Sequence, residues 1–179
     1  MIPDRDAALA SVLHNLVTDV LTGLDAGSED EVDPTALASM RRSVEWVLRQ
    51  LPPDQLLFGT PDGNPNPAVL PTVVGLLVDI IWWLDSCDDD EVDPDTAVKF
   101  AENCAAELHA LPAGQRGRLV EVLARLADTE PHPGKQHQLR FFPHAMGFIK
   151  DEPDTGDVPD LDDGDTPEWV RPEDRTAAR

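Results

Sequence analysis

The sequence predicts an all-α protein of five to six helices, and three observations lead to this prediction. Apolar residues recur at spacings of three and four along much of residues 1–150, as on helices with one buried face. Asp-Pro pairs at 33–34 and 93–94 precede two of these patterns, as expected for an N-cap followed by the first helical residue. Residues 19–34 return sixty positions later as 79–94, without a gap and with eight of sixteen positions identical. Such a repeat indicates a duplicated helical unit.

The first repeat unit, about 5–55, is expected to be a helical hairpin. One apolar stripe runs from about 4 to 24, and a second runs from 34 to 51, where two prolines end the helix. The stretch 54–68, DQLLFGTPDGNPNPA, is rich in Pro, Gly and Asn, which predicts a loop.

The second unit, about 68–115, is expected to form helices at 71–85 and 94–111. Residues 71–85 are apolar nearly all round, which predicts a central, buried helix. Their β-branched residues also allow a strand, but we favour a helix because the counterpart in the first unit, 18–24, lies in a helical stripe. A compact bundle and a short solenoid are both compatible with two such hairpins.

Helices at about 115–127 and within 136–149 are expected to cap the two hairpins over residues 115–149. A turn is expected at 129–135, and a break near Pro143 in the last helix. These elements complete a helical domain over 1–150.

Residues 151–179 contain eleven acids, three bases and four prolines, which predicts a disordered acidic tail. Trp169-Val170 is the exception within it, since this pair can dock on the body or on a partner.

The net charge of −21 and the pI of about 4.3 bound the choice of partner. They disfavour nucleic acid and anionic membranes, because phosphate binding needs a basic patch. Basic proteins, cations and plain solubility remain. The excess of Asp over Glu and of Arg over Lys is also expected of GC-rich coding or salt adaptation, so part of the charge needs no functional explanation.

Neither a membrane span nor a disulfide framework is expected. The longest apolar run, 73–84, is too short to cross a bilayer and contains Asp79. The first residues lack the apolar core of a signal peptide, so we expect a cytoplasmic protein. Cys104 lies on an apolar stripe and is expected in the core. The carboxylates near Cys87 should raise the pKa of its thiol, which disfavours a reactive thiolate.

Known catalytic templates are missing from the sequence. We find no GxGxxG, Walker A, GxSxG, HExxH or CxxC pattern. We therefore expect no cofactor and favour a protein without enzymatic activity. The histidines of 132–144 fit no metal-ligand spacing, and we expect them to lie on the surface or to cap helices.

Two acidic loops join the helices of the two hairpins, and three readings of them stay open. The carboxylates can cap helices and aid solubility, attract a basic protein surface, or bind a cation. The weak candidates for metal ligands are Asp88, Asp89, Asp90 and Glu91. No EF-hand spacing supports them.

Adjacent Trp82 and Trp83 point about 100° apart on a helix. Both can be buried, or one can mark an interface, where Trp is enriched. Their repeat counterparts are Thr22 and Gly23, so the units differ most in bulk just before the acidic loops.

The leading hypothesis is a non-enzymatic interaction module, such as an adaptor, inhibitor or immunity-type partner of a basic protein. If both loops lie at one end, they form one negative surface. The alternative is a metal-dependent helical enzyme or cation-binding regulator that uses the loop Asp88–Asp95. The oligomeric state is not predicted. The expected partner-binding residues are Asp30, Glu31, Trp83, Asp88, Asp89, Asp90, Glu91 and Trp169.

Overall fold

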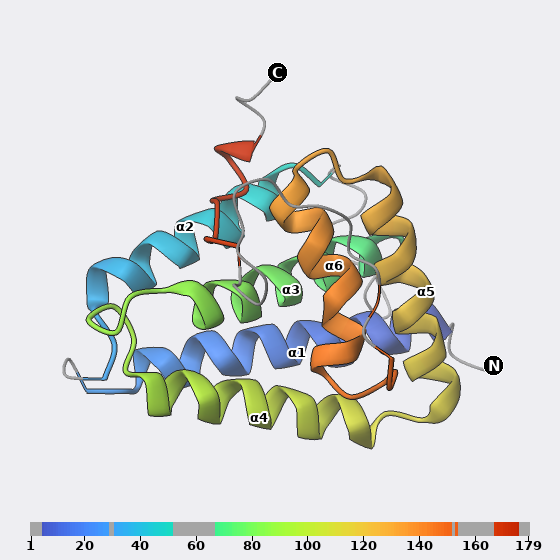
Figure 1. Ribbon diagram of the computed structural model, residues 1–179, viewed down its shortest axis with the longest axis horizontal. Helices are drawn as coiled ribbons and strands as arrows, with labels where there is room; N and C mark the ends of the chain where they lie inside the picture. The colour runs from blue at the N-terminus through green and yellow to red at the C-terminus, as the bar shows by residue number, and fades with distance from the viewer. Residues whose placement is uncertain (1–4, 29–30, 52–66, 152, 154–166, 176–179) are drawn as a thin grey trace, which may run out of the picture.

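The fold is all-α, as Figure 1 shows for the computed structural model, which describes residues 5–28, 31–51, 67–151, 153 and 167–175. Among these residues the elements are α1 (Arg5–Asp25), α2 (Pro34–Arg49), the 3₁₀ turn η2 (Pro67–Val69), α3 (Leu70–Ser86), α4 (Pro94–Ala110), α5 (Ala113–Thr129) and α6 (Pro133–Ala145). The β pairing between them is one isolated bridge, Val32 to Val92. The predicted fold class is therefore confirmed.

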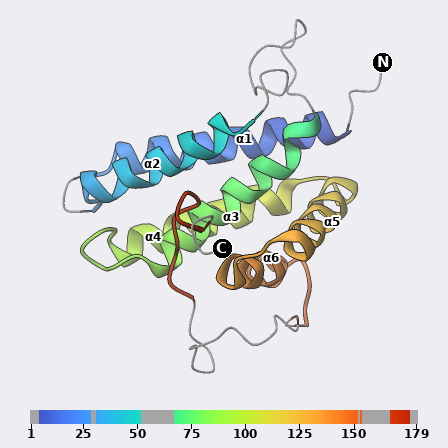
Figure 2. The same cartoon turned by 90° about the horizontal axis from the view of Figure 1, so that it is seen from above.

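Helix α3 is the centre of the molecule and packs against each of the other five α-helices. Figures 1 and 2 show it between the α1–α2 hairpin and the α5–α6 pair, with α4 running beside α1. It buries both Trp82 and Trp83, at 1% and 3% exposure. The prediction of a buried central helix is confirmed, and burial on all sides explains why its sequence shows no polar face.

Helices α2 and α4 begin as the Asp-Pro pairs predict. The Asp33 carboxylate accepts hydrogen bonds from the backbone N–H groups of Thr35 and Ala36, at 3.2 and 3.0 Å. The Asp93 carboxylate accepts one from Thr96 N–H at 3.0 Å. Each aspartate thus satisfies donors that the first turn leaves without helical partners.

The two acidic loops lie at the same end of the molecule and bind each other. Asp33 N–H donates to Glu91 O at 2.7 Å, and Asp93 N–H donates to Glu31 O at 2.8 Å. Asp93 is the repeat counterpart of Asp33, and Glu91 is that of Glu31. The two hydrogen bonds are therefore equivalent, and the contact has local two-fold symmetry. The views in Figures 1 and 2 agree that the α1–α2 and α3–α4 connections lie side by side.

The start and the end of α6 correct two predictions. The turn expected at 129–135 is shorter, because α5 continues to Thr129 and α6 begins at Pro133. His132 is the N-cap of α6, and the imidazole Nδ1 of His132 accepts a hydrogen bond from Lys135 N–H at 3.2 Å. The break expected near Pro143 comes two residues later, since α6 ends at Ala145. Pro143 has no N–H to donate to the carbonyl four residues before it, so it stands in the last turn of the helix.

Residues 167–175 of the predicted tail pack against the body. The Trp82 indole N–H donates to Pro167 O, and Trp169 N–H donates to Ser86 Oγ at 3.1 Å. The Trp169 side chain packs against the core. The predicted tail is therefore not disordered throughout, because residues 167–175 are ordered. They include the Trp169-Val170 pair, which docks on the body. Residues 152, 154–166 and 176–179 of the predicted tail and nearly all of the predicted loop 54–68 lie outside the described residues.

Two helical stretches, Arg5–Asp25 and Pro67–Ser86, are long and apolar enough to cross a membrane by length and composition. The most apolar window of the second is 67% buried inside the protein. A core helix meets the same two criteria. Cytoplasmic location stays a prediction from the sequence.

Candidate functional site

A cavity of ≈ 510 Å³ opens where the paired acidic loops meet α2, α3 and the segment 167–175. We call it the acidic cavity. It is lined by Asp33, Thr35, Ala36, Ser39, Arg42, Trp83, Ser86, Cys87, Asp88, Glu91, Glu168, Trp169, Val170, Arg171 and Asp174.

The lining of the acidic cavity is predominantly negative. It contains five carboxylates and two guanidinium groups, which gives a formal charge of −3. A concave site lined mainly by one sign of charge concentrates the field and raises the local concentration of ions of the opposite sign. The cavity therefore favours a cation over an anion.

Equivalent glutamates of the two loops serve different purposes. The Glu31 carboxylate accepts from Ser28 N–H and Ser28 Oγ, at 2.9 and 3.1 Å, which closes its own loop and lowers the pKa of Glu31. In the second loop Asp88 replaces that serine. The Glu91 carboxylate makes no hydrogen bond among the described residues and lines the acidic cavity. Glu91 is thus available to an incoming group.

Two buried polar atoms on the wall of the acidic cavity have no hydrogen-bond partner among the described residues. They are Ser39 Oγ and Trp169 Nε1. Because the indole N–H can only donate, it needs an acceptor. An unmade hydrogen bond of a buried group costs about 1–3 kcal/mol.

The structure gathers half of the residues expected to bind a partner. Trp83, Asp88, Glu91 and Trp169 line the acidic cavity, although Trp83 offers only 3% of its surface. Asp89 lines a neighbouring cavity between α3, α4 and α6, and Asp90 is exposed on the same loop. Glu31 closes the first loop, and Asp30 lies outside the described residues.

Metal and thiol chemistry find little support in the described residues. Within 5–28, 31–51, 67–151, 153 and 167–175 no group of three or more His, Cys, Asp or Glu side chains converges as metal ligands. Burial, then the nearby Glu91 carboxylate, raises the pKa of the Cys87 thiol to about 11. Burial raises that of Cys104 to about 12. Both thiols are therefore protonated at neutral pH.

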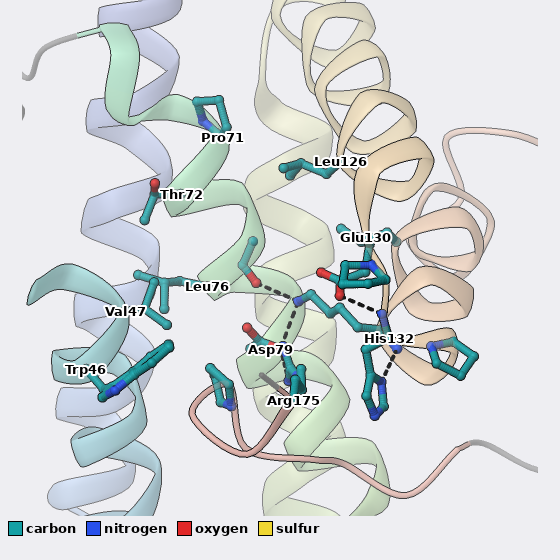
Figure 3. A pocket seen from close by; sticks show the side chains of 16 residues that line it. Trp46, Val47, Pro71, Thr72, Leu76, Asp79, Leu126, Glu130, His132 and Arg175 are labelled. Atoms are coloured by element: carbon teal, nitrogen blue, oxygen red, sulfur yellow. Dashed lines mark hydrogen bonds and ion pairs between the residues drawn. The ribbon is translucent and has the colours of Figure 1, made fainter. Parts of the chain in front are cut away.

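A second cavity, of ≈ 730 Å³, lies between α2, α3, the α5–α6 connection and the end of the segment 167–175. We call it the Asp79 cavity. Figure 3 shows Trp46 and Val47 on one side of it and Asp79, Arg175 and His132 on the other. It is lined by Trp46, Val47, Pro71, Thr72, Gly75, Leu76, Asp79, Leu126, Glu130, Pro131, His132, Pro133, Lys135, Leu139, Pro172 and Arg175.

Three buried charges meet in the Asp79 cavity, and we call them the charged triad. Asp79 Oδ1 on α3 accepts from Lys135 Nζ of α6 at 2.8 Å and from Arg175 Nη2 at 2.6 Å. The side chains of Asp79, Lys135 and Arg175 are 7%, 4% and 9% exposed. Lys135 Nζ also donates to Gly75 O at 2.8 Å. The Arg175 guanidinium lies over the Trp82 ring, 5.2 Å from its centroid.

Burial and the second cation change the titration of the groups around the triad. Burial, opposed by Asp79 and reinforced by Arg175, lowers the pKa of Lys135 to about 8. Burial and the charge of Arg175 lower the pKa of His132. Its Nδ1 is the acceptor at the start of α6, which fits a neutral imidazole at pH 7.

Sequence reasoning missed the charged triad, although one signal for it was present. Asp79 stands inside the most apolar helix, where an ionised side chain requires a partner. Its partners lie 56 and 96 residues further along the chain. Neither of them follows a pattern that singles it out, since Lys135 was placed in a turn and Arg175 in a tail.

The comparisons with known proteins give no family: no family model, curated protein or solved structure matches the chain. The function is therefore argued from the geometry of the two cavities alone.

Proposed function

We propose that the protein is a non-enzymatic interaction module whose acidic cavity receives a basic segment of a partner protein. The observation that carries this proposal is the pairing of the two loops through Asp33–Glu91 and Asp93–Glu31 backbone hydrogen bonds. This pairing joins the two acidic loops into one negative surface, as opposed to two separate ones.

The chemistry of the acidic cavity supports a peptide more than a simple cation. A Lys or Arg side chain can pair with Asp88 and Glu91, which both line the cavity. Charge-assisted hydrogen bonds of this kind give orientation as well as affinity. A lone metal ion would need several converging ligands, and no group of three or more His, Cys, Asp or Glu side chains converges among the described residues.

A titration with a short lysine-rich peptide tests the proposal, at low and at moderate salt. Glu91→Gln should weaken binding about tenfold, roughly 1.4 kcal/mol, because the Glu91 carboxylate makes no hydrogen bond within the described part of the protein and is free to pair with the peptide. Glu102→Gln is the matched control, since it removes the same charge from an exposed site on α4 outside the cavity. It should change the affinity by less than about twofold.

Affinity capture from the native cell extract then serves to identify the partner. The full-length protein and the Glu91→Gln variant serve as bait at both salt concentrations. A basic protein retained by the first and lost with the second supports the proposal. Equal peptide affinities of the Glu91→Gln and Glu102→Gln variants would show instead that only the overall charge matters.

A further inference from the structure

The Asp79 cavity has an opening that helix packing does not require, at Gly75. This residue stands in the middle of α3, where glycine weakens a helix relative to alanine. A Cβ atom added to it would meet no atom within 4 Å. Close packing therefore does not explain the glycine. Its effect is to keep one wall of the Asp79 cavity hollow.

The charged triad at the polar end of the Asp79 cavity carries a formal charge of +1, and Glu130 brings the formal charge of the whole described lining to zero. Lys135 and Arg175 share a single carboxylate oxygen, Asp79 Oδ1. The remaining carboxylate of the lining, Glu130, accepts from His132 N–H at 2.9 Å. At Lys135 the repulsion from Arg175 outweighs the attraction of Glu130. The two cations thus share one directly paired anion.

Hydrogen-bonding capacity is also left over at this end. An ammonium group has three N–H donors and a guanidinium five. Lys135 Nζ uses donors on Gly75 O and Asp79. Arg175 donates from Nε to Val170 O and from Nη2 to Asp79. Within the described residues, Arg175 Nη1 makes no hydrogen bond.

The rest of the Asp79 cavity is apolar. Trp46 and Val47 of α2, Leu76 of α3 and Leu126 of α5 form its walls. Its size, ≈ 730 Å³, falls within the range of about 300–1,000 Å³ that is typical of small-molecule sites. The cavity is therefore built for an apolar body with a charged end.

We infer that the Asp79 cavity binds a small amphipathic anion, with a carboxylate or phosphate head group on Lys135 and Arg175 and an apolar body against Trp46, Val47 and Leu76. A second anion would offset the excess positive charge of the charged triad. A cationic or neutral head group would not. This site is separate from the acidic cavity, so it stands or falls independently of the proposed function.

Calorimetric titration of the full-length protein at pH 7 tests the inference with four probes that share an eight-carbon chain: octanoate, octyl phosphate, 1-octanol and octyltrimethylammonium. The two anions should bind with one-to-one stoichiometry and at least about tenfold more tightly than the other two. The stronger of the two anions assigns the head group. Equal affinity for octanoate and octyltrimethylammonium, or no binding of either anion, would overturn the inference.

Variants then place the ligand in the cavity. Gly75→Leu fills the hollow wall and should lower octanoate affinity about tenfold or more, and Lys135→Met should do the same by removing a cation. Arg49→Met is the control, because it removes an exposed cation from α2 at 72% side-chain exposure. It should leave the affinity within about twofold.

A measurement on the wild-type protein covers the case in which a variant fails to fold. In ¹H–¹⁵N spectra, octanoate should shift the Trp46 indole N–H and the Gly75 amide and leave the Trp169 indole unchanged. Shifts confined to other residues, or undiminished binding by a folded Gly75→Leu variant, would show that the anion does not occupy this cavity.

Discussion

The two repeat units share one turn and one cap, yet they place equivalent aspartates in opposite environments. Asp19 is exposed on α1, whereas Asp79 is 5% exposed on α3 and pairs with Lys135 and Arg175. The turn is local and depends on a few hydrogen bonds that both units can make. The environment of a helix depends on what the rest of the chain packs against it. Sequence similarity between the units therefore predicts the turn and does not predict the site.

The positions just before the acidic loops show the same contrast. In the first unit an added Cβ at Gly23 would lie 2.7 Å from the Phe100 ring, so α1 needs a glycine for α4 to approach. The equivalent Trp83 and its neighbour Trp82 are buried side chains of α3. The first unit thus uses this position for helix contact, and the second uses it to fill the core.

Removal of the carboxylate at the two equivalent aspartates should give the largest difference between the units. Asp79→Asn removes the carboxylate that the buried Lys135 and Arg175 share, and we expect a loss of about 3–5 kcal/mol in the free energy of unfolding. Asp19→Asn changes an exposed side chain and should stay within about 0.5 kcal/mol. Urea unfolding measures both. Similar losses would mean that the environments are not as different as the structure shows.

The pH dependence of stability should reveal Lys135 of α6, which pairs with Asp79 of the second unit. Its pKa is about 8 in the folded protein and 10.5 as the ordinary value. Between these values the unfolded chain binds a proton that the folded protein does not. Stability therefore rises with pH in this window, by on the order of 3 kcal/mol relative to Lys135→Met.

Urea unfolding of both proteins at several pH values from 7 to about 10.5 measures this difference. Asp79, Arg175, Glu130 and His132 surround Lys135 in both proteins. Their titration therefore cancels to first order in the comparison. A difference that is constant across the window would contradict the low pKa of Lys135.

The N-caps should behave alike in the two units, because there the structures agree. Asp33→Ala and Asp93→Ala each remove a carboxylate that accepts from the first turn of its helix. Each should cost about 1 kcal/mol of unfolding free energy. Thermal or urea unfolding of the two variants side by side measures the costs. If one of the two variants lost no stability, the loop before that helix would be held by the Asp33–Glu91 and Asp93–Glu31 backbone hydrogen bonds alone.

The smallest effect on stability is expected from alanine substitutions at the helical glycines. The two units should differ in whether the substitution stabilises the protein. Gly75→Ala should stabilise the protein by about 0.5–1 kcal/mol, because alanine favours the helix and its Cβ enters open space. Gly23→Ala should stabilise it less or destabilise it, because the Phe100 ring has to move. A larger gain at Gly23 than at Gly75 would contradict the packing described for the two helices.

Local patterns predicted most of the fold. Apolar spacing and the Asp-Pro caps predicted five of the helices to within a few residues, because these signals lie within each helix. The start of α6 was missed because its N-cap is His132, which is outside the usual capping residues. The sequence predicts one negative surface only if both acidic loops lie at the same end of the molecule. The Asp33–Glu91 and Asp93–Glu31 hydrogen bonds show that they do.

The sites were predictable only where their residues are close in sequence. Asp88 and Glu91 stand out as an acidic run, and they line the acidic cavity. The charged triad joins residues from α3, α6 and the segment 167–175, and its geometry depends on the packing of all three. No spacing rule within one segment can reveal such a site. An acid within an apolar helix indicates only that buried partners exist somewhere in the fold.

The segment 167–175 is synthesised after every helix that it contacts, so its contacts are the last to form during biosynthesis. Until it leaves the ribosome, Asp79 lacks Arg175 and the Trp82 indole lacks Pro167. Domains begin to fold during synthesis, before such late residues arrive. A polypeptide cut short before 167 would therefore fold with an incompletely paired acid beneath its surface. Such chains would unfold more often than complete ones, and cellular proteases would remove them preferentially.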